Sequence, residues 1–141
     1  MNFPFHAVIR SEEETILTAQ NFANKIEIGD VILLNGDLGS GKTFFVKYIC
    51  KEFGVENVLS PSFAIVNEYH NKKNFVHFDF YRIKKVEELY DIGFHEYLNG
   101  ENIVFIEWSN MFPDILPKRN YQIDLKFVNN TSREISIVKH A

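Results

Sequence analysis

The segment 36–43, with the sequence GDLGSGKT, constrains this chain most, because it fits the phosphate-binding loop pattern G-x-x-x-x-G-K-[ST]. It follows the apolar run 31–34. After it, apolar residues recur with helical spacing: Val46, Ile49, Cys50 and Phe53. A buried strand before the loop and a helix after it are the context that this motif requires. The sequence therefore predicts binding of a nucleoside triphosphate.

The chemistry of such a loop follows from its residue types. Glycines let successive main-chain N–H groups turn inward around phosphate oxygens, and the next helix adds its positive N-terminal end. Lys42 is expected to reach the β- and γ-phosphates, and the Thr43 hydroxyl is expected to ligate Mg²⁺. The residues predicted to contact the nucleotide here are Asp37, Leu38, Gly39, Ser40, Gly41, Lys42, Thr43 and Phe44.

Two carboxylates at predicted strand ends are candidates for the rest of the site. Glu107 ends the apolar run 103–106, where a metal-binding carboxylate is expected to face the phosphate loop. Asp79 lies in the alternating segment 75–81, whose period of two places His77 and Asp79 on one face. Glu107 is predicted to serve Mg²⁺ and Asp79 to assist hydrolysis. His77 is interpreted as a hydrogen-bonded core or rim residue rather than a catalyst.

The remaining patterns predict an α/β fold, with residues 1–141 forming one domain of the P-loop NTPase type. Its expected form is a three-layer sandwich with a mixed central sheet and antiparallel hairpin additions. The expected strands are 5–9, 31–35, 64–69, 75–80, 103–106, 121–128 and 134–138. The expected helices are 11–26, the stretch from the loop to Phe53, 86–92 and 94–98.

Charge and hydropathy exclude several classes of function. A net charge of −4 and an isoelectric point near 5.7 give no basic field of the kind that holds a nucleic-acid backbone directly. The sequence shows no signal-peptide pattern and no apolar run of membrane-spanning length. These observations predict a cytoplasmic protein that does not contact membranes.

Four ordered motifs resemble the TsaE family, also called YjeE, the small bacterial ATPases of tRNA threonylcarbamoyladenosine biosynthesis. They are 36–43, Ser60-Pro61-Ser62-Phe63, 77–82 and 106–108. The resemblance implies an ATPase that uses ATP and Mg²⁺ and hydrolyses weakly alone. It also implies action with TsaB and TsaD, which transfer threonylcarbamoyl to adenosine 37 of tRNA. The chain is then expected to contact tRNA only indirectly, through the complex.

Carried over by motif, the resemblance assigns a role to each of several residues. Lys42 contacts phosphate, and Thr43 and Glu107 serve Mg²⁺. Asp79 assists hydrolysis, and Trp108 lies close to the nucleotide. An indole just after a buried strand is also typical of a plug at the edge of the core, and both interpretations of Trp108 stay open.

The family usually has Ser-Pro-Thr-Phe where this chain has residues 60–63. Ser62 keeps the hydroxyl that would contact the metal or the γ-phosphate. Arg82 is as typical of a surface residue as of a phosphate contact, and it is left outside the catalytic set.

Three other functions share the phosphate loop. A small-molecule kinase needs an arginine-bearing lid and an acceptor insert, for which residues 83–106 leave little room. A nucleotide-gated interaction module with incidental turnover differs from the ATPase only in degree. A GTPase is not supported, because the turn 71–74 lacks the aspartate that reads guanine.

Overall fold

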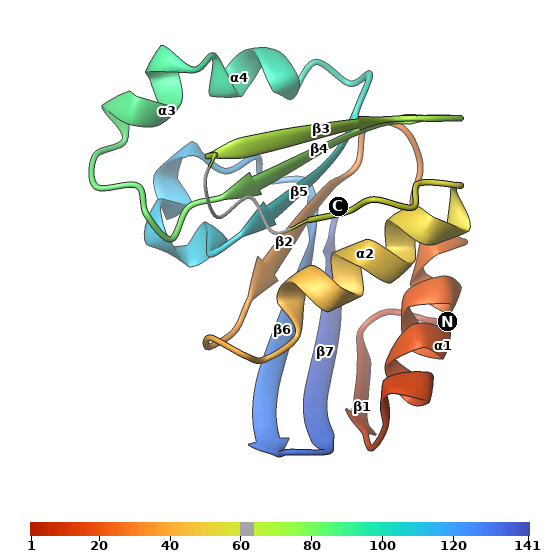
Figure 1. The fold of residues 1–141 in the computed structure, drawn as a ribbon. Helices are drawn as coiled ribbons and strands as arrows, with labels where there is room; N and C mark the ends of the chain where they lie inside the picture. The colour runs from red at the N-terminus through yellow and green to blue at the C-terminus, as the bar shows by residue number, and fades with distance from the viewer. Residues whose placement is uncertain (60–63) are drawn as a thin grey trace.

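A computed structural model describes residues 1–59 and 64–141. In this part of the chain the sheet has seven strands in the order β1-β7-β6-β2-β5-β4-β3 (Figure 1). The strands are β1 Phe5–Ile9, β2 Val31–Asn35, β3 Val66–His70, β4 Asn74–Asp79, β5 Ile103–Glu107, β6 Asn120–Asn129 and β7 Ser132–His140. The helices are α1 Glu12–Ala23, α2 Lys42–Glu52, α3 Glu87–Asp91 and α4 Phe94–Tyr97, with short 3₁₀ turns η1 Ser109–Met111 and η2 Pro113–Ile115.

The centre of the sheet is parallel. β2 pairs in parallel with β5 and with β6, and β5 pairs in parallel with β4. β1, β7 and β3 join through antiparallel pairings. All five residues of β5 are buried, as expected of a parallel strand that is covered on both faces. The central strands end at the same edge of the sheet, where Leu34 and Asp79 both lie beside Glu107 in the register.

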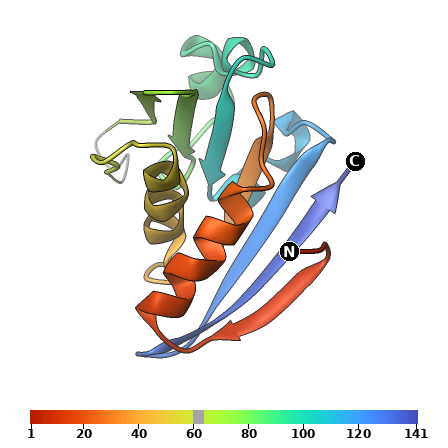
Figure 2. The ribbon, with the colours of Figure 1, turned by 90° about the vertical axis from the view of Figure 1, so that its right-hand side faces the viewer.

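Helices cover both faces of the sheet, which confirms the predicted α/β class and its three layers (Figures 1 and 2). α1 and α2 pack on one face, where Phe22, Phe45 and Ile49 are fully buried. α3 and α4 pack on the other, where Leu89 and Phe94 are fully buried. The alternation predicted for β4 is also confirmed: Phe75 faces α1 and α2, whereas the even-numbered residues of the strand face α3 and α4.

The helix predicted over 11–26 is shorter than expected. Ser11 caps it by accepting a hydrogen bond from the N–H of Glu14, as its sequence predicts. It ends at Ala23, because the N–H of Lys25 turns back to the carbonyl oxygen of Phe22 and tightens the last turn. Ile26 is still buried in the core from outside the helix. The hairpin of β3 and β4 begins two residues later than predicted, at Val66.

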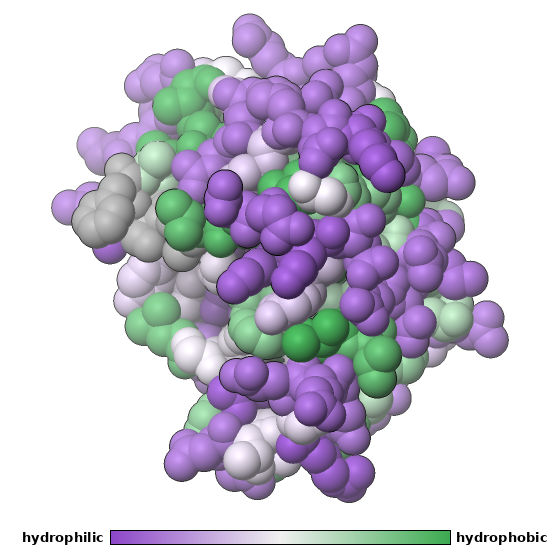
Figure 3. Space-filling model, turned by 45° about the vertical axis from the view of Figure 1, so that its right-hand side comes forward, coloured by the Kyte–Doolittle hydropathy of each residue, from purple (hydrophilic) through white to green (hydrophobic). Residues whose placement is uncertain are grey.

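The face drawn in Figure 3 is largely hydrophilic, and its hydrophobic residues form small separate patches. Within residues 1–59 and 64–141, no helix has both the length and the apolar character needed to cross a membrane.

Candidate functional site

The segment 36–43 connects β2 to α2, as the motif requires (Figure 1). A Cβ at Gly36 would collide with the carbonyl oxygen of Leu125 and would stand 2.6 Å from Oγ of Ser40. Gly41 is the N-cap residue of α2 and has a φ of 102°, which glycine adopts without strain. Because Gly41 has no side chain to cap the helix, the N–H groups of its first turn stay available to an anion.

Lys42 places a buried ammonium group against this loop. The residue is 5% exposed. Its Nζ donates hydrogen bonds to the carbonyl oxygens of Gly36, at 2.5 Å, and Asp37, at 3.0 Å. It also lies 4.4 Å from the centre of the Trp108 ring. Burial lowers the pKa of Lys42, and neighbouring carboxylates partly offset that effect. An incoming phosphate would compete with the loop carbonyls for this ammonium group.

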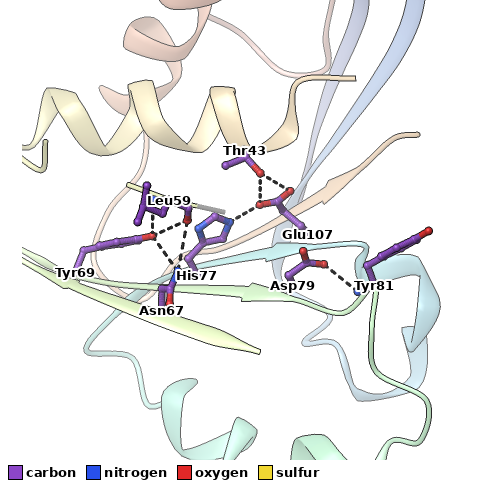
Figure 4. Close-up of polar contacts among 8 residues, drawn as sticks. All are labelled: Thr43, Leu59, Asn67, Tyr69, His77, Asp79, Tyr81 and Glu107. Atoms are coloured by element: carbon purple, nitrogen blue, oxygen red, sulfur yellow. Dashed lines mark hydrogen bonds and ion pairs between the residues drawn. The ribbon is translucent and has the colours of Figure 1, made fainter. Parts of the chain in front are cut away.

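Glu107 is the meeting point of three elements (Figure 4). It ends β5, and it is 3% exposed. The hydroxyl of Thr43, from the first turn of α2, lies 3.0 Å and 2.9 Å from the two carboxylate oxygens. Nε2 of His77, from β4, lies 2.5 Å from Oε2 of the same carboxylate. The structure therefore brings together Thr43 and Glu107, the two residues predicted to serve Mg²⁺.

His77 is absent from the residues that the sequence predicts for the site, although its alternation places it on the correct face. It is fully buried, as expected of a core histidine, but its hydrogen-bond partner is the carboxylate at the centre of the site. The two residues are 30 positions apart. Nothing in the spacing of a single sequence indicates this contact.

Asp79 lies near Glu107 at the end of the neighbouring strand β4. Its Oδ1 accepts a hydrogen bond of 2.9 Å from the N–H of Tyr81. Burial raises the pKa of Asp79, and the charge of Glu107 adds to this effect. A cavity of about 340 Å³ joins these groups. Its lining includes Lys42, Thr43, Asp79, Arg82, Glu107 and Trp108.

Trp108 follows β5 in a left-handed conformation, with a φ of 58°, and it is the one non-glycine residue with a positive φ in the described part of the chain. Its main-chain N–H donates to the carbonyl oxygen of Leu34 at 3.0 Å. Its ring lies 4.8 Å from that of Tyr81. The indole thus packs at the edge of the core and also lines the cavity beside Lys42. Its contact with the nucleotide stays a prediction.

The other residues predicted to contact the nucleotide are distributed along the loop. Asp37 to Gly41 form its turn, and Leu38 at the tip is 68% exposed. Ser40 is buried, and its Oγ has no hydrogen-bond partner in the part of the chain that the structure describes. Phe44 lies in the first turn of α2. Ser62 lies outside the residues that the structure describes.

A second cavity, of about 520 Å³, also adjoins the loop. Ile9, Thr15 and Leu125 are among the residues that line it, together with Ser40, Gly41, Phe44, Asn130, Thr131 and Arg133. Arg133 was not predicted for the site. Its Nη2 donates to the carbonyl oxygen of Gly39 at 3.1 Å, and no local pattern indicates that contact because the two residues are 94 positions apart.

Comparison with known proteins shows the family of the chain. The family model described as "Threonylcarbamoyl adenosine biosynthesis protein TsaE" matches residues 9–135. Proteins named "tRNA threonylcarbamoyladenosine biosynthesis protein TsaE" are similar over most of their length. That of Rickettsia typhi is 42% identical over 134 residues, covering 93% of this chain and 92% of its own. That of Bacillus subtilis is 36% identical over 126 residues, covering 88% and 78%.

A solved structure agrees with these sequence matches. The crystal structure of YdiB from Bacillus subtilis superposes with a TM-score of 0.81 at 29% sequence identity, and the match covers 100% of this chain and 88% of that one. The sequence motifs, the sheet and the family model thus all point to one family, and the chain belongs to the TsaE family of threonylcarbamoyl adenosine biosynthesis proteins.

Proposed function

We propose that this protein is the ATP-binding and ATP-hydrolysing subunit of the machinery that forms N6-threonylcarbamoyladenosine in tRNA. One observation carries the proposal: Lys42, Thr43 and Glu107 converge beside a glycine-rich loop at the start of a helix. A buried cation, a hydroxyl and a carboxylate in this arrangement match the division of labour of a phosphate-binding loop.

The chain's own groups would bind the phosphates. The first-turn N–H groups of α2 and the loop amides are donors in a concave site. Lys42 would exchange its bonds to the carbonyls of Gly36 and Asp37 for bonds to the β- and γ-phosphates. This exchange keeps the ammonium group hydrogen-bonded in both states, so that its burial is compensated before and after binding.

The donor set of the site fits Mg²⁺. Thr43 and Glu107 offer hard oxygen atoms, and Mg²⁺ typically binds one or two such groups together with phosphates and water. Among the described residues, no cluster of three or more His, Cys, Asp or Glu side chains is arranged to hold a metal ion. When bound, the ion would neutralise charge that develops on the phosphates. Thr43 and Glu107 would orient it directly or through water.

Asp79 would orient the attacking water or a water bound to the metal. It lines the same cavity as Lys42 and Glu107, and positioned carboxylates serve this role in phosphoryl transfer. Hydrolysis by the chain alone is expected to be slow, because partner groups commonly complete such sites.

The larger cavity is suited to the nucleoside. Both cavities reach Gly41 and Phe44, so a triphosphate chain could run along the loop from one to the other. Apolar groups from Ile9 and Leu125 would contact the base, and hydroxyl and amide side chains would fix its orientation.

The names of the relatives support a role in the tRNA modification, and we propose TsaB and TsaD as the partners of this chain in the cytoplasm. A net charge of −4 supports contact with tRNA through the complex rather than directly.

The proposal is tested by calorimetry with ATP and GTP, with and without Mg²⁺, followed by hydrolysis assays with and without the two partner proteins. Binding of Mg-ATP and partner-dependent turnover are expected. Absence of heat with any purine triphosphate would refute the nucleotide site. An Asp79→Ala variant that binds ATP and still supports tRNA modification would show that turnover is not obligatory, which favours a nucleotide-gated module.

A further inference from the structure

A histidine at position 77 of β4 lowers the stability of the fold. Its side chain is fully buried between Tyr69 and Phe105, whose ring centres lie 6.4 Å and 6.3 Å from its own. Its Nδ1 is buried and has no hydrogen-bond partner among residues 1–59 and 64–141. A buried polar atom without a partner costs about 1–3 kcal/mol. An aromatic hydrocarbon such as its neighbour Phe75 would avoid that cost, so packing alone does not account for a histidine here.

The second nitrogen shows what the histidine contributes. Nε2 lies 2.5 Å from Oε2 of Glu107 (Figure 4). An ionised carboxylate only accepts hydrogen bonds, so Nε2 is the donor of this bond. It satisfies one oxygen of a carboxylate that is 3% exposed, and buried charges require such partners.

Thr43 does not fix Glu107 by itself. Its hydroxyl lies at similar distances from both carboxylate oxygens, 3.0 Å and 2.9 Å, and it has only one hydrogen to donate. The carboxylate can therefore rotate under Thr43 without losing that bond. The bond from His77 is made to one oxygen only, and it comes from a side chain locked in the core.

We propose that His77 is a positioning residue: its Nε2–H holds the Glu107 carboxylate in the orientation that Thr43 and Glu107 need to receive the Mg²⁺ of Mg-ATP. The inference rests on the proposed nucleotide site. It predicts that His77 sets the Mg²⁺ concentration that the site requires, and that it has little effect on binding of nucleotide without the metal.

Two substitutions of similar size separate positioning from packing. His77→Gln keeps an N–H donor at about the place of Nε2, whereas His77→Leu removes it and keeps the volume. Calorimetric titration of ATP over a series of Mg²⁺ concentrations gives the half-saturating concentration for each protein. We expect His77→Leu to need about 10- to 100-fold more Mg²⁺, the usual effect of losing a partner of a metal ligand, and His77→Gln to recover most of the loss. Binding of metal-free ATP should match the wild type.

A matched control exists on the surface. His6 forms the same kind of bond with Glu134, at 2.8 Å, but both side chains are exposed. His6→Gln should leave the Mg²⁺ requirement unchanged. A wild-type requirement in His77→Leu would overturn the inference, and so would a Gln variant as impaired as the Leu variant. Failure of the wild type to bind ATP would instead refute the nucleotide site and, with it, this inference.

A spectroscopic measurement on the metal-free protein gives a second readout, which does not depend on how the variants of His77 fold. In nitrogen-correlated NMR spectra of wild type, the Nε2–H proton of His77 should exchange slowly with water. Glu107→Ala should abolish that protection, and His6→Gln should preserve it. Rapid exchange of this proton in wild type would overturn the proposal.

Discussion

Two histidine–glutamate pairs join neighbouring strands in the described ranges 1–59 and 64–141, and they differ mainly in their surroundings. Both are diagonal across the pairing: His6 lies opposite Ser136, two residues from Glu134, and His77 lies opposite Phe105, two residues from Glu107. The side chains of the first pair are 59% and 41% exposed, and those of the second are 0% and 4% exposed.

The contrast shows that strand pairing brings the histidine and the glutamate together, and that their burial decides how much the pair contributes. At the antiparallel edge, water can replace either partner and salt screens the charges, so such a pair contributes little. In the parallel centre, Thr43 of helix α2 lies against Glu107 and both side chains of the pair are almost fully buried, so removing one partner leaves the other poorly solvated. The same two residue types thus form a surface contact in one place and the support of a candidate metal site in the other.

The largest effect is expected from removing the buried carboxylate. Glu107→Ala should lower Mg-dependent ATP hydrolysis by about 100-fold or more, because partners of a metal ion contribute at least 10- to 100-fold, while ATP binding should change less. Phosphate release and calorimetry measure the two properties. Glu134→Ala, at the exposed pair, should hydrolyse ATP like the wild type. Normal hydrolysis by the Glu107 variant would contradict the metal assignment.

A second test compares two lysines of α2. Lys42→Met should weaken ATP binding by about 10- to 100-fold, since a charge-assisted hydrogen bond contributes roughly 1.5–3 kcal/mol. Lys47 is exposed and lies near the Tyr48 ring, and Lys47→Met should bind ATP normally. Equal affinities for the two variants, measured by calorimetry, would remove Lys42 from the phosphate site.

Asp79 extends the comparison to stability. Because burial raises the pKa of this carboxyl, the folded chain holds its proton more tightly than the unfolded chain, and stability falls as the pH rises from 3.8 through the folded pKa. Asp79→Asn removes that penalty and keeps the oxygen that accepts from Tyr81. The variant should be more stable than wild type at neutral pH and should lose the advantage in acid. Urea unfolding at several pH values checks this, and an advantage independent of pH would contradict it.

The smallest effect is expected at the exposed pair. The hydrogen bond from His6 lowers the pKa of Glu134. The pair therefore contributes to stability above pH 4.5, and this contribution is lost as the pH falls through the pKa of Glu134 in the folded chain. His6→Gln should therefore change thermal stability only slightly near neutral pH and should leave hydrolysis intact. A large loss of stability, measured by thermal unfolding, would show that solvent exposure does not predict how much such a pair contributes to stability.

Local patterns in the sequence predict much of the fold and part of the site. The apolar run before Glu107 predicts β5 because a strand buried on both faces has few polar residues. The glycine spacing of 36–43 predicts the loop because Gly36 lies too close to Leu125 for a side chain and Gly39 and Gly41 have a positive φ. Alternation predicts the orientation of β4.

Contacts between distant strands are not predicted in this way. The bond of His77 to Glu107 depends on which strand lies beside β4 and on its register, and neither is encoded within one element. The hydrogen bond from Arg133 to the carbonyl oxygen of Gly39 likewise depends on where the β6–β7 hairpin lies relative to the loop. The apolar spacing predicts a helix that continues to Ile26, but α1 ends at Ala23. Ile26 is buried in the core without being part of the helix.

The position of Trp108 makes the candidate site optically visible. It is the only tryptophan of the chain, and its ring lies 4.4 Å from the ammonium group that a phosphate would draw away. Indole emission responds to a nearby charge, so the protein carries its own fluorophore at the site where nucleotide would bind. With excitation at the red edge of the indole band, where the six tyrosines absorb little, occupancy can thus be followed in unlabelled protein from this one ring.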